Sequence, residues 1–101
     1  MYLVQALLPL RDNEGCDFPR ETFDHVVQQL TDQFGGATAY TRSPAEGAWA
    51  QDDREQREDV IVVEVMVEKL DRSWWAEFRR QLEGNFGQEQ ILARALRVEL
   101  L

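Results

Sequence analysis

The sequence is poor in cysteine, histidine and lysine, and each shortage removes a class of function. Cys16 is the only cysteine, so no disulfide can form within the chain and nothing indicates an oxidising compartment. His25 is the only histidine. One cysteine and one histidine cannot build a zinc site without several carboxylates, so no metal site is predicted. Lys69 is the only lysine. With a net charge of -8 and no basic stripe, the chain is not expected to bind nucleic acid.

Long hydrophobic runs are also missing. No run approaches the roughly eighteen residues of a membrane span, so no membrane segment is predicted. Residues 1–10 are apolar but lack a basic region and a small-residue cleavage site, so we expect a strand there and a cytoplasmic protein. Hydrophobic residues make up 44% and charged residues 30% of the 101 residues, which is typical of a soluble globular protein. We expect residues 1–101 to form a single domain.

Residues 59–70 contain the best strand candidate in the chain. Residues 60–67 are β-branched at six of eight positions, which is the composition that a central strand favours. One face of this strand would carry only apolar side chains, those of Ile61, Val63, Val65 and Val67. The other face would carry Val60, Val62, Glu64 and Met66. The first face requires a hydrophobic core, and the second requires partial cover.

Two amphipathic helices are predicted, one on either side of this strand. The first begins with Pro19 in its first turn and ends at Gly35, since glycine readily takes the left-handed cap position. The second follows residues 71–73, which offer capping groups. Trp74 and Trp75 cannot both point inward, so one is expected at an edge or under a partner subunit. The apolar faces at helical spacing are Phe23, Val26, Val27, Leu30 and Phe34, then Trp75, Phe78, Leu82 and Phe86.

Three further strands complete the predicted order. Residues 2–8 alternate in a strand pattern, and residues 37–42 read as a second strand. Residues 91–100 fit a strand or a helix, and we expect a strand because the preceding order requires a fourth one. The order is β-α-β-β-α-β, an α+β ferredoxin-like fold with a four-stranded antiparallel sheet and two helices on one face. In this fold the first and third strands are central.

Three separate segments carry a resemblance to a known group of proteins. They are Phe34-Gly35-Gly36-Ala37-Thr38 with Tyr40, then Gly47-Ala48-Trp49, and finally Phe86-Gly87-Gln88-Glu89-Gln90-Ile91-Leu92. The pattern resembles small bacterial ferredoxin-like proteins of uncharacterised function, with phenylalanine and glycine before the second strand, G-x-W after it, and F-x-Q-E-x-x-L before the last. This resemblance covers the chain from about residue 30 onward and implies the fold.

The predicted architecture is also similar to that of two better-known groups. They are the dimeric α+β barrel proteins and the trimeric signal-transduction proteins related to nitrogen regulator PII. Both groups use the open sheet face or the loop between the second and third strands. The present sequence lacks the phosphate-binding glycine and lysine pattern of the PII-like group, so that similarity concerns the fold.

Four residues form the candidate ligand site, Tyr40, Arg42, Trp49 and Glu64. If the second and third strands pair as a hairpin, the first two lie near Glu64 on the mixed face, with Trp49 at the rim. Aromatic rings beside opposite charges suit a small polar or anionic ligand. The same residues also suit a subunit contact, and this interpretation is favoured, because aromatic anchors are usual in interface cores.

Other reactive side chains have ordinary explanations. His25 lies off the apolar stripe of the first helix and should be solvated. The spacing gives no support for a catalytic dyad of His25 with Cys16 or Ser43, so no catalytic residue is predicted. The charged residues 51–59 lack the glycine and periodicity of a calcium loop and should form a solvated loop.

These observations favour a homo-oligomeric protein, most simply a dimer, that acts as a binding or structural domain. Its predicted interface is the row of Val60, Val62, Glu64 and Met66, because an exposed half-apolar sheet face is usually covered by symmetric association. One alternative is a cofactor-independent enzyme of the dimeric α+β barrel kind. Another is a regulatory sensor that acts through residues 51–59. No cofactor is predicted for any of the three.

Overall fold

The computed structural model describes residues 1–42 and 60–101 and confirms the predicted order of elements. These elements are β1 (Tyr2–Pro9), α1 (Arg20–Phe34), β2 (Thr38–Arg42), β3 (Val60–Val67), α2 (Arg72–Asn85) and β4 (Ala93–Arg97). The uncertain last segment is a strand, although it is shorter than the residues 91–100 expected from the sequence. None of the helices in the described ranges is both long and apolar enough to cross a membrane.

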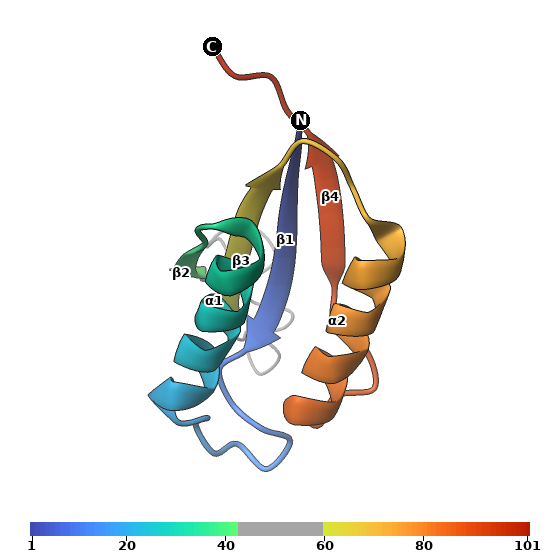
Figure 1. Ribbon diagram of the computed structural model, residues 1–101. Helices are drawn as coiled ribbons and strands as arrows, with labels where there is room; N and C mark the ends of the chain where they lie inside the picture. Colours follow the sequence, from blue (N-terminus) through green and yellow to red (C-terminus); the bar gives the residue numbers. More distant parts are fainter. Residues whose placement is uncertain (43–59) are drawn as a thin grey trace, which may run out of the picture.

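The four strands form one antiparallel sheet in the order β2-β3-β1-β4. Strands β1 and β3 are therefore central, as predicted. Both helices lie on the same face of the sheet, α1 over the β3 side and α2 over the β4 side (Figure 1). This arrangement is the ferredoxin-like α+β fold, and within residues 1–42 and 60–101 no helix lies on the other face of the sheet.

The helix ends follow from local sequence. Gly35 adopts φ 86°, a left-handed conformation in which its N–H reaches the carbonyl of Thr31. Asp71 caps α2, because its carboxylate accepts a hydrogen bond from the backbone N–H of Trp74 at 3.1 Å. Pro19 is the cap residue of α1 and lies just before the first helical turn, in which the sequence had placed it. Its fixed φ of -58° still directs the chain into the helix.

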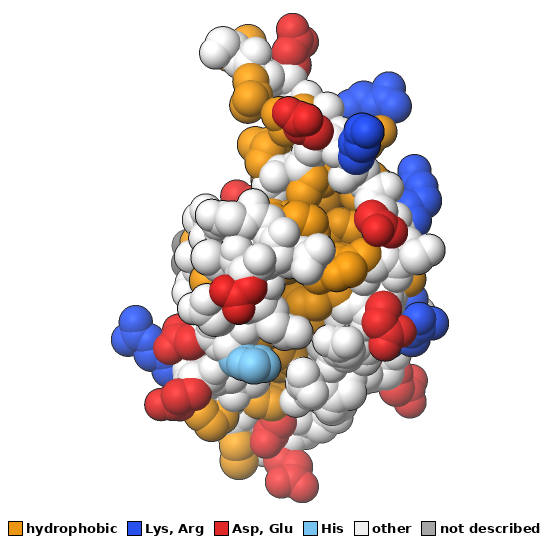
Figure 2. All heavy atoms as spheres, in the orientation of Figure 1, with side chains coloured by type: hydrophobic (Ala, Val, Ile, Leu, Met, Phe, Trp, Pro, Cys, Tyr) orange, Lys and Arg blue, Asp and Glu red, His pale blue; other side chains and the backbone are white. Residues whose placement is uncertain are grey.

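The hydrophobic core lies between the helices and the inner face of the sheet. The inner rows of the two central strands are Val4, Ala6 and Leu8 from β1 and Ile61, Val63, Val65 and Val67 from β3. From α2 and the residue after it, Trp75, Phe78, Leu82 and Phe86 are buried, which confirms the predicted stripe. Trp74 is only half-buried, in agreement with the expectation that one of the adjacent tryptophans lies at an edge. Hydrophobic side chains also fill the furrow between the two helices (Figure 2).

Candidate functional site

The sheet face opposite the helices, which we call the open face, carries polar residues at its centre. Cross-strand partners share a face because side chains alternate along each strand. Gln5 in β1 is in register with Glu64 of β3 on one side and with Arg94 of β4 on the other. The inner row of β1 belongs to the core, so these three residues lie on the open face.

Hydrogen bonds join these side chains across the sheet. The Gln5 amide donates from Nε2 to Glu64 Oε2 at 2.8 Å, and its Oε1 accepts from Arg94 Nε at 2.9 Å. The hydroxyl of Tyr40 in β2 donates to the same Glu64 oxygen at 3.3 Å. Tyr40, Glu64, Gln5 and Arg94 thus form a connected line over all four strands, which we call the polar row.

Burial along the polar row is uneven. Gln5 is 8% exposed and is the buried polar residue found in the described ranges. Its amide uses both a donor and an acceptor, so its burial is compensated by hydrogen bonds. Glu64 is half-buried and Arg94 is exposed. Their hydrogen bonds use Glu64 Oε2 and Arg94 Nε, and the described residues give no partner to Glu64 Oε1 or to the terminal Arg94 nitrogens. The row therefore offers carboxylate and phenol oxygens toward one edge and guanidinium donors toward the other.

Apolar side chains surround the polar row. Leu3 is in register with Met66 on one side and Leu96 on the other, which makes an apolar line parallel to the polar one. Met66 is 45% exposed and Leu96 41% exposed. Charged groups framed by apolar side chains favour recognition of a defined surface or ligand, because water is partly excluded around them.

The structure brings together part of the predicted ligand site. Tyr40 and Glu64 meet through their hydrogen bond, as expected for a hairpin of the second and third strands. Arg42 occupies the last position of β2, where it is in register with Val60. Trp49 lies outside the described residues, so its predicted place at the rim stays a prediction. Of the four predicted ligand-site residues, only Tyr40 and Glu64 are seen in contact within the described residues.

The predicted interface row occupies the open face, but its residues differ in accessibility. Met66 is exposed, while Val60 and Glu64 are half-buried. Val62 is only 1% exposed and offers almost no area to a partner. A charge placed at Val62 would consequently test folding before association. Glu64 is the better position for a substitution that tests the interface.

Sequence reasoning missed two members of the polar row, Gln5 and Arg94. Each is polar at a position where its strand is otherwise mostly apolar on that face, and this was the available signal. Their link to Glu64 depends on the strand register, which pairs residues 59 and 89 positions apart in the chain. An isolated glutamine or arginine in a strand does not reveal such a partner.

Other candidates from the sequence stay apart from this site. His25 is exposed on α1, as predicted, and Cys16 is an exposed free thiol. Residues 51–59 and Ser43 lie outside the described residues. Within residues 1–42 and 60–101, no three His, Cys, Asp or Glu side chains gather in a way that would hold a metal ion.

Comparisons with known proteins give a fold relationship. No protein-family model matches the chain, and no curated protein matches its sequence. Among solved structures, the chain is similar to a phage SAM lyase in complex with S-methyl-5'-thioadenosine, with a TM-score of 0.62 and 11% sequence identity. The similarity covers 94% of this chain and 79% of the lyase chain. At this identity the likeness concerns the fold, which this chain shares with the lyase along nearly its whole length.

Proposed function

We propose that this chain is a homo-oligomeric binding domain that forms a dimer through its open sheet face. Both helices cover the other face (Figure 1). The open face presents exposed apolar side chains, those of Met66 and Leu96, beside the polar row. Apolar surface of this kind is usually covered in soluble proteins by a partner. The observation that carries the proposal is the order of charges across the face.

This charge order is self-complementary. Glu64 and Arg94 lie one strand to either side of Gln5, each about 4.8 Å away at the usual strand spacing. If a second copy stacks face to face about a two-fold axis that runs along β1, Glu64 of each copy lies opposite Arg94 of the other. A two-fold axis along the polar row would instead oppose like charges. The first arrangement is therefore favoured.

The apolar line obeys the same symmetry. The axis along β1 places Met66 of one copy opposite Leu96 of the other, with Leu3 near the axis. Packed sheets are about 10 Å apart, a distance that extended arginine and glutamate side chains on facing sheets can bridge. The proposed interface thus contains an apolar centre beside two ion pairs, an arrangement found in many homodimers.

A charge exchange tests this proposal. Glu64→Arg alone and Arg94→Glu alone place like charges opposite each other, so each variant should be monomeric at concentrations where the original chain is a dimer. Mixing the two variants restores opposite charges, and a heterodimer should form. The double variant should form a homodimer again. Light scattering after size exclusion gives the masses, and native mass spectrometry identifies the heterodimer.

The matched control is Glu77→Arg, which makes the same change in charge on the exposed surface of α2. It should leave the dimer intact, and circular dichroism should show that every variant is folded. A monomeric original chain at all concentrations, or variants that do not recover on mixing, would overturn the proposed interface.

A second candidate function is the binding of a small ligand at the Tyr40 end of the polar row. Tyr40 is 41% exposed, and its hydroxyl lies beside the half-buried Glu64 carboxylate. The structurally similar SAM lyase holds S-methyl-5'-thioadenosine, a molecule with an aromatic base and hydroxyl donors. An aromatic ring next to a carboxylate can stack on such a base and accept hydrogen bonds from such hydroxyls.

Calorimetric titration with S-methyl-5'-thioadenosine tests the second candidate. Tyr40→Phe removes the hydroxyl that donates to the Glu64 carboxylate, and Glu64→Gln replaces the carboxylate that would accept from the ligand's hydroxyls. Each change should weaken binding of the ligand about tenfold. Tyr40→Phe leaves the charges of the proposed dimer contacts unchanged, so the dimer should persist in that variant, whereas Glu64→Gln also removes the charge that faces Arg94 and should weaken the dimer. The absence of binding to the original chain would dismiss this ligand and leave the dimer proposal unaffected. The enzyme and sensor alternatives gain no support from the described residues and stay predictions.

A further inference from the structure

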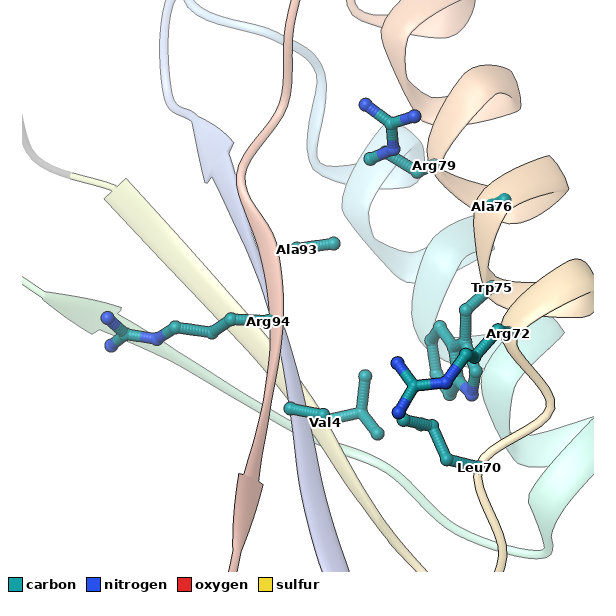
Figure 3. A pocket seen from close by; sticks show the side chains of 9 residues that line it. Val4, Leu70, Arg72, Trp75, Ala76, Arg79, Ala93 and Arg94 are labelled. Carbon is teal, nitrogen blue, oxygen red and sulfur yellow. The ribbon is translucent and has the colours of Figure 1, made fainter.

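A cleft of about 210 Å³ lies on the helix-covered side, between α2 and the edge strand β4. It exists because the residues of β4 that face α2 are small: Ala93 and Ala95 leave the space beneath the helix unfilled. With Val4 they form an apolar floor. Figure 3 shows the Arg94 side chain leaving β4 on the opposite side. Arg94 borders the cleft through its place in β4, but its guanidinium is directed away from it, so the hydrogen bonds of the polar row lie outside the cleft.

A buried tryptophan in the wall of this cleft has an unused donor. Trp75 is 9% exposed, and its indole Nε1 is buried without a hydrogen-bond partner among the described residues. An indole nitrogen can only donate, and buried donors in folded proteins are nearly always paired. The ring stacks on Phe34 with an interplanar angle of 1°, which fixes its orientation. Figure 3 shows it extending from α2 toward Leu70, beside Arg72.

Two arginines stand on the same face of α2 as Trp75. Arg72 and Arg79 lie three residues before and four residues after it, the spacing that brings side chains to one side of a helix. Arg79 is paired with Glu83 at 3.3 Å, whereas Arg72 has no carboxylate within 4.0 Å in the described ranges. Arg72 is also the first residue of α2, where the helix dipole disfavours a cation. A local preference broken in this way is typical of a functional position.

We propose that this cleft binds a small organic anion, a carboxylate or phosphate monoester on a compact apolar body. The anionic oxygens accept hydrogen bonds from Arg72 and, after a small shift of the side chains that bury its Nε1, from the Trp75 indole, and the apolar body rests on Val4, Ala93 and Ala95. Guanidinium groups recognise both kinds of oxyanion. The cleft is smaller than a typical drug-sized pocket, which restricts the body to about one ring or a short branched chain. Such a site would attract anions locally although the chain as a whole carries a net charge of -8.

Nuclear magnetic resonance of the ¹⁵N-labelled full chain tests this site. Three tryptophans give three indole signals, and Trp75→Phe identifies the signal that belongs to the cleft. Titration with benzoate or phenyl phosphate should shift this signal downfield in a saturable way, and the tighter of the two identifies the anionic group. Benzyl alcohol has a similar body without the charge and should bind at least about tenfold more weakly. Titration with inorganic phosphate measures the binding of the anionic group without an apolar body attached.

Variants on the same helix provide the specificity control. Arg72→Gln should weaken binding about tenfold, because a charge-assisted hydrogen bond is lost. Arg80→Gln removes an equal charge from an arginine that is paired with Glu77 and does not line the cleft, and it should leave the affinity unchanged. Arg94→Gln should also have no effect, which separates this site from the polar row. The proposal is overturned if neither anion shifts the Trp75 signal saturably, if benzyl alcohol binds equally well, or if Arg80→Gln matches Arg72→Gln.

Discussion

The two faces of the sheet are built from the same strands but differ in almost every physical property. On the inner face Leu8 is fully buried, and the aromatic side chains of both helices complete the core above it. On the open face Leu96 is 41% exposed and lies one row from the polar row. The inner face supplies most of the folding free energy, while the open face carries charge order and accessible apolar area. The proposed dimerisation would therefore place stability and recognition on opposite sides of one sheet.

The substitution Leu8→Ala should have the largest effect on this division. It removes a fully buried side chain, and the expected loss is about 2–5 kcal/mol in the free energy of unfolding. The same chemical change at Leu96 should alter stability by only about 0.5 kcal/mol under dilute, monomeric conditions. Urea denaturation of both variants gives the comparison. Equal losses at the two positions would show that the faces are not energetically distinct.

The dependence of stability on protein concentration gives a second comparison of Leu8→Ala and Leu96→Ala. If the open face is the dimer interface, the stability cost of Leu96→Ala should grow with protein concentration, because the dimer adds to the stability of the original chain. The cost of Leu8→Ala should not depend on concentration in this way.

Gln5→Leu tests the intermediate case, a buried polar side chain at the centre of the open face. The change keeps the size of the side chain but removes the partner of both Glu64 and Arg94. We expect a loss of about 1–2 kcal/mol, moderated because these two charged groups can still reach water. Thermal unfolding measures the loss. A more stable variant would mean that the polar row costs folding energy and is retained for recognition.

Asp71→Ala should have a smaller effect than Gln5→Leu and should act on the helical layer alone. The loss of the side-chain cap of α2 should cost about 1 kcal/mol in unfolding free energy. Because Asp71 caps a helix on the opposite face of the sheet from the polar row, the dimer dissociation constant should stay unchanged. Analytical ultracentrifugation tests this point. A weaker dimer would show that the helical layer and the open face are coupled.

Most of the fold was predictable from local chemistry. Residues 60–67 are a central strand because their β-branched composition leaves little alternative, and Gly35 and Asp71 lie at the helix ends where such residues are expected. The final strand was harder to predict, since an arginine interrupts its apolar pattern. Its small residues Ala93 and Ala95, which leave the α2–β4 cleft open, carry no local signal for a cavity.

The functional candidates depended on long-range register in a way that the fold did not. Tyr40 and Glu64 were recognised because they lie on neighbouring strands of a predictable hairpin. Gln5 and Arg94 joined them only through the pairing of β1 with β3 and β4, and the unused indole donor of Trp75 became visible only once its neighbours were known. Hydrophobic periodicity, turn residues and caps act over a few positions, so the chain alone specifies its elements and their order. Which polar groups meet, which donors stay unpaired and which apolar rows remain uncovered depend on contacts between distant segments, and those arise only when the sheet assembles.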